Sequence, residues 1–245
     1  MARPSKPRDV TELRARVASV RLKGPTTSQT DRARKLLLVY LDTADSHAVP
    51  FADLVKSLRS GLPALRIAGA ELARQASDSA GPFAGIDCAA GCAFCCILSG
   101  TDGGTITAAE AEQLHAALAP QAGSDSASAW HPQACAALDP ATRQCRAYEA
   151  RPLICRSYIS TDVTACEQIA EGTPAAGAGV VGAQGLALAV HALIRAALEG
   201  VSQVPTYALA RITAGAMQGE EAATTLRAAR QPPRALDDER RRFGA

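Results

Sequence analysis

The sequence predicts a mainly α-helical protein in which helical elements flank an irregular, cysteine-rich core. Two observations support this prediction. Alanine-rich segments with apolar residues at helical spacing lie towards both ends of the 245-residue chain. The middle third holds all eight cysteines, four of them within nine residues, and its later part contains prolines that favour loops and short elements. The cysteines are Cys88, Cys92, Cys95, Cys96, Cys135, Cys145, Cys155 and Cys166.

The first 80 residues are expected to form a helical arm. A helix is predicted over residues 31–40, where Asp31 can cap the N-terminus and no helix breaker interrupts the pattern. Residues 51–58 and 67–75 continue with apolar residues at helical spacing. We expect this arm to pack on the cysteine-rich part of the chain; the alternative is that it contains a dimerisation helix.

A further helix is predicted directly after the first cysteine cluster. Thr107 and Glu110, three residues apart, fit a capping box, so a helix should begin here and extend to about residue 119. Residues 121–129 are rich in glycine, serine and alanine and predict a loop.

The C-terminal third is expected to be helical as well. A Gly/Ala-rich connector over residues 171–183 precedes a strong Ala/Leu helix over residues 184–198, and two more helices should follow before Pro232. The charged run 237–243 predicts a solvated, partly disordered end. The expected organisation is a helical arm at 1–80, a metal-binding cysteine domain at 81–170, helices packing on the core at 171–230 and a disordered tail at 231–245.

Composition narrows the classes of function. A hydrophobic fraction of 47% with 20% charged residues is typical of a globular protein, and a net charge of +2 gives no case for a nucleic-acid partner. The basic residues 1–8 are not followed by an apolar segment, so we predict no secretory signal. The weakly apolar stretch 175–194 consists mainly of alanine and glycine and predicts a buried helix, not a membrane span. We therefore expect a cytoplasmic protein, in which thiols stay reduced.

The spacing of the first four cysteines predicts a metal site. A loop carrying Cys92-x-x-Cys95 can direct two sulfurs to one ion, and Cys88 and Cys96 extend the donor set. Thiolates are soft ligands that favour zinc, copper(I) and iron–sulfur clusters. The adjacent Cys95 and Cys96 cannot easily reach the same tetrahedral ion, so they serve different metals or one of them is not a ligand. Structural disulfides are disfavoured because the chain shows no export signal.

Four pieces of the sequence resemble a known family in order and spacing. They are Gly91-Cys92-x-x-Cys95-Cys96, Ile106-Thr107-x-x-Glu110-Ala111, Cys135-x-x-Leu138 and Cys145-x-x-Tyr148-x-x-Arg151-Pro152-x-x-Cys155-Arg156. Together they resemble the YkgJ-type cysteine-cluster family, the CxxCxxCC zinc- or iron-chelating domain, over roughly residues 85–168. The three-residue spacer between Cys88 and Cys92 departs from the family's pattern.

The resemblance implies a metal-binding function. It implies ligation by Cys92, Cys95, Cys96, Cys135, Cys145 and Cys155, with Cys88 and Cys166 as additional ligands. Some members of the family are described as iron–sulfur oxidoreductases, and related domains occur in flagellin lysine methylases. An oxidoreductase or a protein- or peptide-modifying enzyme is therefore one expectation, with a protein or peptide as the substrate.

Arginines among the cysteines fit this interpretation. Four thiolates around Zn²⁺ or around a cluster core of charge about +2 leave a net charge of about −2 that requires compensation. Arg146, Arg151 and Arg156 are placed to supply it as cofactor-binding residues. The alternative for Arg151 is that it pairs with Glu149 or caps a carbonyl. Tyr148 and Tyr158 are expected to be packing residues, and His131 is the best-placed histidine for a ligand.

Three functions remain open. Eight thiols exceed the ligands of one structural zinc, which favours iron or an iron–sulfur cluster. A non-catalytic interaction module stabilised by zinc is the first alternative. A metal buffer or redox sensor that uses spare thiols is the second.

Overall fold

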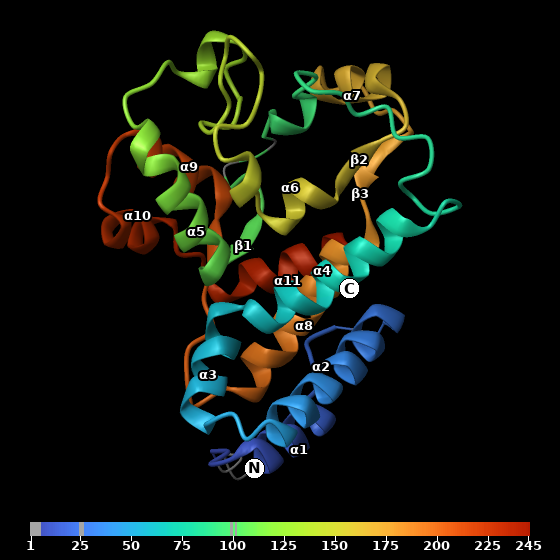
Figure 1. Ribbon diagram of the computed structural model, residues 1–245, viewed down its shortest axis with the longest axis vertical. Coiled ribbons are helices and arrows are strands. Elements are labelled where there is room, and N and C mark those ends of the chain that lie inside the picture. The colour runs from blue at the N-terminus through green and yellow to red at the C-terminus, as the bar shows by residue number, and fades with distance from the viewer. Residues whose placement is uncertain (1–5, 25–26, 99, 101) are drawn as a thin grey trace. The chain divides into compact units, whose positions relative to one another are not determined.

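The computed structural model describes residues 6–24, 27–98, 100 and 102–245 (Figure 1). Its 11 α-helices and 57% helical content, with only two small two-stranded sheets in the described part, confirm the mainly α prediction. None of the described helices combines the length and apolar character that a membrane span requires. Residues 1–5, part of the basic segment 1–8 considered in the secretory-signal prediction, lie outside the described residues.

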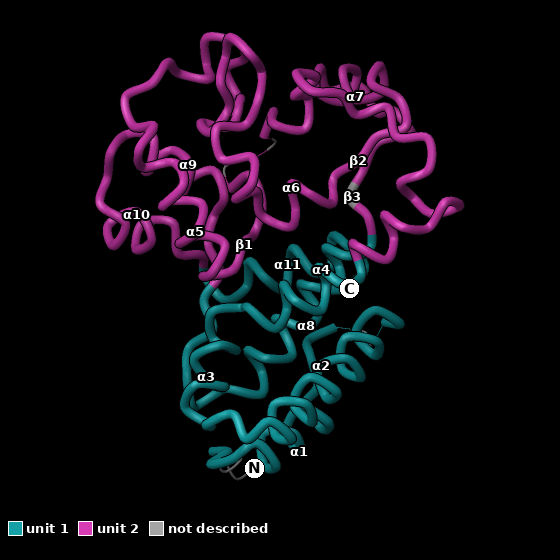
Figure 2. Tube along the Cα trace, viewed as in Figure 1, with its two compact units in different colours: residues 1–71, 182–205, 232–245 teal, residues 72–181, 206–231 magenta. Residues whose placement is uncertain are grey.

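The chain divides into two compact units, each assembled from separate stretches of sequence (Figure 2). The helical unit comprises residues 1–71, 182–205 and 232–245. The cysteine unit comprises residues 72–181 and 206–231. Four consecutive segments were expected, whereas these two units interleave along the chain.

The helical unit is organised around the helix α8 (Gly182–Ala197). Nearly every residue of α8 is buried, because the helix packs against α1 (Val10–Ser19), α2 (Ser28–Ser46), α3 (Phe51–Ser60) and α11 (Pro233–Arg242). The helix α4 (Leu62–Ser77) begins in this unit. Short alanines on α8 allow its neighbours to approach closely, while leucines fill the spaces between them.

The helices expected near residues 31–40, 51–58 and 67–75 are present as α2, α3 and α4. α2 begins before Asp31, because the side chain of Thr27 accepts a hydrogen bond from the backbone N–H of Thr30 and caps the helix. The local cap therefore decides where this helix starts.

The expectation of a disordered tail over residues 231–245 differs from the structure. Residues 233–242 form α11, and its Leu236 and Arg240 are each 1% exposed. The Arg240 guanidinium donates hydrogen bonds to the carbonyl oxygens of Lys23 and Ala245. Leu236 and Arg240 are four residues apart and therefore lie on the same face of α11, which is buried. The charged side chains on the opposite face are solvated.

The cysteine unit contains a small α-helical core. β1 (Thr105–Thr107) pairs antiparallel with β4 (Thr206–Ala208), with Ile106 opposite Tyr207. The strands lead into α5 (Ala108–Leu118) and α9 (Leu209–Met217), which pack together and against α10 (Ala222–Ala229). The predicted capping box is confirmed, since Thr107 and Glu110 bond reciprocally at the start of α5.

The remainder of the cysteine unit is irregular. β2 (Tyr158–Ser160) pairs with β3 (Ala178–Val180) and lies between the short helices α6 (Leu153–Ser157) and α7 (Val163–Ala170). Between α5 and α6, residues 119–152 contain only single 3-10 turns and isolated β-bridges. This part of the chain has few regular hydrogen bonds of its own, so other contacts must hold it in place.

Candidate metal centre

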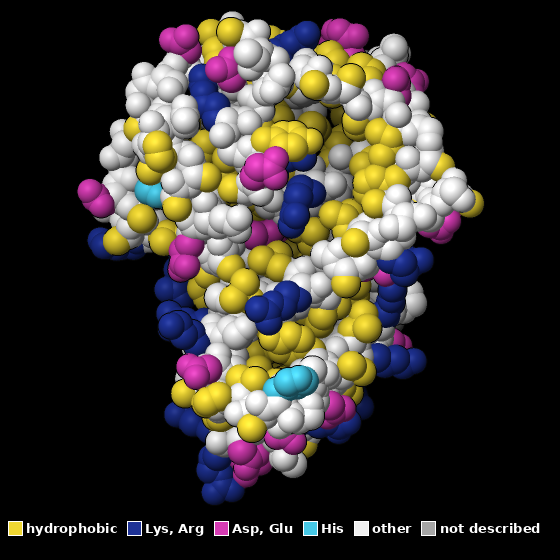
Figure 3. All heavy atoms as spheres, in the orientation of Figure 1, with side chains coloured by type: hydrophobic (Ala, Val, Ile, Leu, Met, Phe, Trp, Pro, Cys, Tyr) yellow, Lys and Arg dark blue, Asp and Glu magenta, His cyan; other side chains and the backbone are white. Residues whose placement is uncertain are grey.

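All eight cysteines are free thiols within the cysteine unit. The 3-10 helix η1 (Phe94–Cys96) carries two of them, α6 carries Cys155 and α7 carries Cys166. Cys88 and Cys95 are exposed, Cys166 is buried and the other five are half-buried. On the face shown in Figure 3, hydrophobic side chains, a class that includes cysteine, line a hollow in this part of the molecule.

The inner thiol group consists of Cys96, Cys135, Cys145 and Cys155. The backbone N–H of Cys135 donates to the carbonyl of Cys96 at 2.7 Å, and a β-bridge joins Leu138 to Cys145. Cys135, Cys145 and Cys155 pack against the apolar core of α5 and α9. These contacts bring together thiols that lie 59 residues apart, from Cys96 to Cys155.

Burial and the charges of neighbouring thiols both raise the pKa of inner thiols. Burial raises the pKa of Cys135 to about 11, although Thr213 Oγ1, 3.8 Å from its sulfur, opposes the shift. Burial also raises the pKa of Cys155, and the negative charges of Cys135 and Cys145 raise it further. Thiols this reluctant to ionise bind a metal only when the ion displaces their protons.

The outer thiol group consists of Cys88, Cys92, Cys95 and Cys166, and Ser160 at the end of β2 anchors two of its members. The Ser160 N–H donates to Cys88 Sγ at 3.3 Å, and the Ser160 hydroxyl bonds to the Cys166 thiol. Partial desolvation raises the pKa of Cys88 and of Cys166, and the charges of Cys92 and Cys95 add to both shifts.

Asp87 fixes the outer group to the start of α7. Its N–H donates to the Ser160 carbonyl at 2.9 Å, and its carboxylate accepts from the N–H of Val163 at 3.1 Å. The segment before Cys88 is therefore tied to the helix that carries Cys166.

Cys95 belongs to the outer group and also acts on thiols of the inner group. The Cys96 thiol donates a hydrogen bond to Cys95, which lowers the pKa of Cys95 to about 7 against the opposing effect of burial, with help from the charge of Arg151. The charge of Cys95 in turn raises the pKa of Cys88 in the outer group and of Cys155 in the inner group. Cys95 is thus the thiol nearest to ionisation at neutral pH.

Arg151 lies beside the thiols. Its positive charge lowers the pKa of Cys95 and of Cys145, while its Nε donates to the carbonyl of Tyr148 at 3.1 Å. The guanidinium carbon lies 3.6 Å from the centre of the Tyr148 ring, and the tyrosine is 57% exposed. Arg151 therefore caps a carbonyl and also acts on the thiols. The expected packing role of Tyr148 is wrong, because its ring is exposed to solvent and makes a cation–π contact with Arg151.

The other two arginines are placed differently. Arg146 is nearly buried and donates to the carbonyls of Leu138 and Asp125 at 2.8 and 2.9 Å, which ties two loops together beside Cys145. Arg156 is exposed on α6, and its charge acts on the buried Glu110.

Glu110 has a second role that the capping box did not reveal. Its Oε2 accepts from the N–H and hydroxyl of Thr107 at 2.8 and 2.9 Å, and its Oε1 accepts from the N–H of Leu153 at 2.8 Å. One buried carboxylate therefore caps α5 and also the first turn of α6, two residues before Cys155. No local pattern predicts a bond across 43 residues. Ser160 and Thr213 were missed for the same reason.

The thiols are neighbours without forming a preassembled site. Among the residues that the structure describes, no group of three or more His, Cys, Asp or Glu side chains is arranged so that it could hold a metal ion. In His131, the best-placed histidine, Nδ1 accepts a hydrogen bond from the N–H of Gln133 at 3.1 Å. The donor set nevertheless fits a thiophilic metal by its chemistry, because eight free thiols share one unit.

Comparison with known families gives one match. The family model for the CxxCxxCC domain, described as a putative zinc- or iron-chelating domain, matches residues 87–172. The match covers this segment and not the rest of the chain. The match spans all eight cysteines and supports metal binding, without distinguishing zinc from iron. No curated protein and no solved structure matches the chain.

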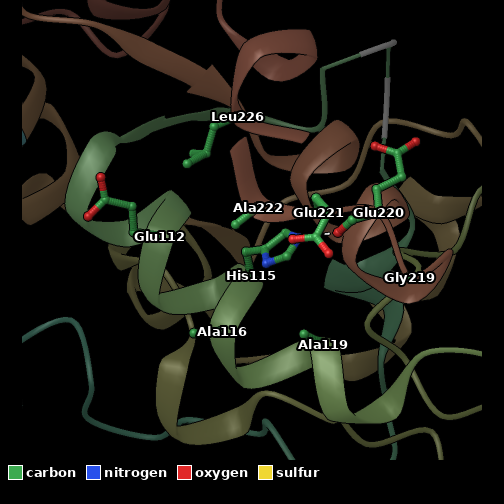
Figure 4. A pocket seen from close by; sticks show the side chains of 9 residues that line it. All are labelled: Glu112, His115, Ala116, Ala119, Gly219, Glu220, Glu221, Ala222 and Leu226. Atoms are coloured by element: carbon green, nitrogen blue, oxygen red, sulfur yellow. Dashed lines mark hydrogen bonds between the residues drawn. The ribbon is translucent and has the colours of Figure 1, made fainter. Parts of the chain in front are cut away.

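A pocket of about 390 Å³ lies on another part of the cysteine unit (Figure 4). Glu112 and His115 of α5 face Glu220, Glu221 and Leu226 across it. The Nε2 of His115 donates to the carbonyl of Glu220 at 3.0 Å, which ties α5 to the turn before α10. No cysteine lines this pocket, so it is separate from the CxxCxxCC thiols.

Proposed function

We propose that the CxxCxxCC domain holds iron through its cysteine thiolates, as thiolate-bound iron or an iron–sulfur cluster, with zinc as the alternative. The observation that carries this proposal is the gathering of eight free thiols from four separate stretches of chain into one unit. Thiols this close repel one another once ionised, and a bound cation removes that repulsion.

Two features favour iron over a purely structural zinc. Eight thiols are twice the number that a closed zinc site uses. Cys88 and Cys95 are also exposed, whereas structural zinc sites are enclosed by their ligands. An accessible iron centre would supply electron transfer, so oxidoreductase chemistry is the class of reaction that we propose.

The arginines support a centre of net negative charge. Arg151 acts electrostatically on Cys95 and on Cys145, one thiol from each group. Its charge would offset that of thiolates bound to a metal, and its N–H groups would donate to their sulfurs.

The test is the metal content of the full chain purified without oxygen. We expect iron in stoichiometric amounts and visible absorption from thiolate-to-iron charge transfer. A colourless protein with stoichiometric zinc and no iron, after the same handling and with iron present during expression, would refute the iron assignment.

A zinc-stabilised interaction module is the second candidate, and the irregular segment 119–152 favours it. Its regular structure is limited to single 3-10 turns and isolated β-bridges, so metal ligation by Cys135 and Cys145 would supply folding energy directly. Chelation should then abolish the protection of its backbone amides against hydrogen exchange. Unchanged protection after complete metal removal would exclude this function.

A further inference from the structure

We propose that the pocket between α5 and α10 binds a guanidinium group carried on an aliphatic chain, the chemistry of an arginine side chain. The pocket has a volume of about 390 Å³, and all the residues that line it belong to the cysteine unit (Figure 4). No cysteine is among them, so the inference does not depend on a metal and goes beyond the proposed function.

The two walls of the pocket come from different helices. One wall is a single face of α5 and its C-cap, because Glu112, His115, Ala116 and Ala119 follow helical spacing. The other wall is the turn 219–222 with Leu226 of α10. Alanine and leucine side chains therefore offer an apolar surface for methylene groups beside the polar groups of the pocket.

His115 supplies an unused hydrogen-bond acceptor. This residue is only 5% exposed, and its Nε2 donates to the carbonyl of Glu220 at 3.0 Å. A neutral imidazole with its proton on Nε2 has a lone pair on Nδ1. None of the residues that the structure describes bonds to Nδ1, and Figure 4 shows this nitrogen turned away from Glu220. A nearly buried ring thus presents one acceptor to a ligand.

Two carboxylates accompany this acceptor. Glu112 on α5 and Glu221 before α10 lie on opposite sides of His115 in Figure 4, and both are exposed. Within the described part of the chain, neither carboxylate makes a hydrogen bond or an ion pair. The Glu220 carboxylate differs, since Arg211 donates to both of its oxygens at 2.8 Å. Glu112 and Glu221 therefore have acceptors available for a bound cation.

The net charge of the pocket selects the sign of the ligand. Three glutamates line it, Arg211 offsets the charge of one, and the N-terminus of α10 adds about half a positive charge, which leaves about −1.5. None of the described residues that line the pocket is a lysine or arginine. A cation is therefore favoured and an anion is repelled.

The arrangement of the acceptors favours guanidinium over ammonium. A guanidinium directs five N–H donors outwards in one plane, so it can reach carboxylates on two sides and the Nδ1 of His115 between them. It is also more weakly hydrated than an ammonium, which lowers the cost of placing it beside apolar side chains. An ammonium is compact and strongly hydrated, and should therefore bind more weakly.

The experiment titrates the ¹⁵N-labelled full chain, with its metal bound, with n-butylguanidinium and follows backbone amide shifts by NMR. A pH of about 8 keeps the imidazole neutral. We expect saturable shifts at residues 112–119 and 219–226, with a Kd of about 1 mM for so small a probe. The probe N-acetylarginine N-methylamide carries the same group on a peptide backbone. Binding of this probe assigns the pocket to a protein side chain, and its exclusion assigns the pocket to a small free guanidinium compound.

The carboxylates are tested by neutral substitutions of the same size. Glu112→Gln and Glu221→Gln should each weaken binding about threefold, and the double variant about tenfold. The matched control is Glu199→Gln, because Glu199 is exposed and does not line the pocket; it should leave the Kd unchanged. The amide spectrum of each variant reports whether it is folded.

Three results would overturn the proposal. They are equal binding of the uncharged n-butylurea, equal binding of n-butylammonium, and unchanged binding by the folded double variant. Absence of any binding at these residues would also refute it while leaving the iron assignment intact. A failure to find iron or zinc would, conversely, leave this pocket unaffected, since its lining contains no thiol.

Discussion

Replacing Glu110 with alanine tests whether one buried carboxylate fixes the helix that carries Cys155. In the structure this side chain accepts three hydrogen bonds, from the Thr107 N–H and hydroxyl and from the Leu153 N–H, at 2.8 to 2.9 Å. Alanine cannot accept any of them. Thr107 and Leu153 are 7% and 1% exposed, so water has little access to the abandoned backbone donors.

The expected loss of stability comes from two backbone N–H groups, of Thr107 and Leu153, that would be left without an acceptor. A buried donor left without a partner costs about 1–3 kcal/mol, so Glu110→Ala should lower the free energy of unfolding by about 2–6 kcal/mol. Because the Leu153 bond holds the first turn of α6, amides near Cys155 should also exchange hydrogen faster.

Urea unfolding followed by circular dichroism measures the loss, and hydrogen exchange locates it. Glu112→Ala is the matched control on the same helix, since Glu112 is exposed and makes no bond to α6; it should change stability by less than about 0.5 kcal/mol. A loss below about 1 kcal/mol for Glu110→Ala, or unchanged hydrogen exchange in α6, would show that Glu110 does not hold the start of α6.

The pH dependence of the same site gives a second readout. Burial raises the pKa of Glu110, against the hydrogen bonds from Thr107 and Leu153 and the charge of Arg156. The folded protein therefore holds this proton to a higher pH than the unfolded chain, and the free energy of unfolding falls as pH rises from about 4.5 through the raised pKa. Glu110→Gln has no proton to lose, so the stability of the wild type relative to this variant should fall over that window. A rise would contradict the direction of the shift.

Three further substitutions test other parts of the molecule. Gly215→Ala should cost about 1–3 kcal/mol through overpacking, because its Cβ would lie 2.7 Å from Cγ2 of Thr225; an unchanged urea midpoint would contradict this close approach. Burial lowers the pKa of His191 to about 4, so stability should fall by about 3 kcal/mol as pH drops from about 6.5 to 4, and thermal melts of His191→Gln should lose this dependence. Arg146→Met removes two hydrogen bonds to backbone carbonyls and should lower the free energy of unfolding by about 1–3 kcal/mol. Limited proteolysis should then cleave the loops beside Cys145 faster.

The local features of the fold followed from the sequence. The capping box at Thr107 and Glu110 was predicted because it depends on two residue types at a fixed spacing. α8 was predicted because an uninterrupted Ala/Leu run has no competing structure. The charged end was predicted poorly, since the burial of Arg240 depends on carbonyls of Lys23 and Ala245 that no local pattern reveals.

The candidate site shows the same limit. The eight thiols could be named from residue type and spacing, and the family match spans all of them. Which of the thiols lie near one another could not be predicted, because this depends on contacts such as that of Ser160 with Cys88, 72 residues apart along the chain. Tyr148 was expected to be a packing residue, but its ring is exposed and makes a cation–π contact with Arg151.

A mainly helical protein with a thiol-rich centre could be predicted from residue types alone, because helix formation and metal affinity depend on residue type and short-range spacing. The bond by which Glu110 links α5 to α6, and the joining of separate stretches of chain into two units, became visible in the folded chain. Those features depend on contacts between residues far apart in sequence, and chain topology, not local pattern, sets which of them meet.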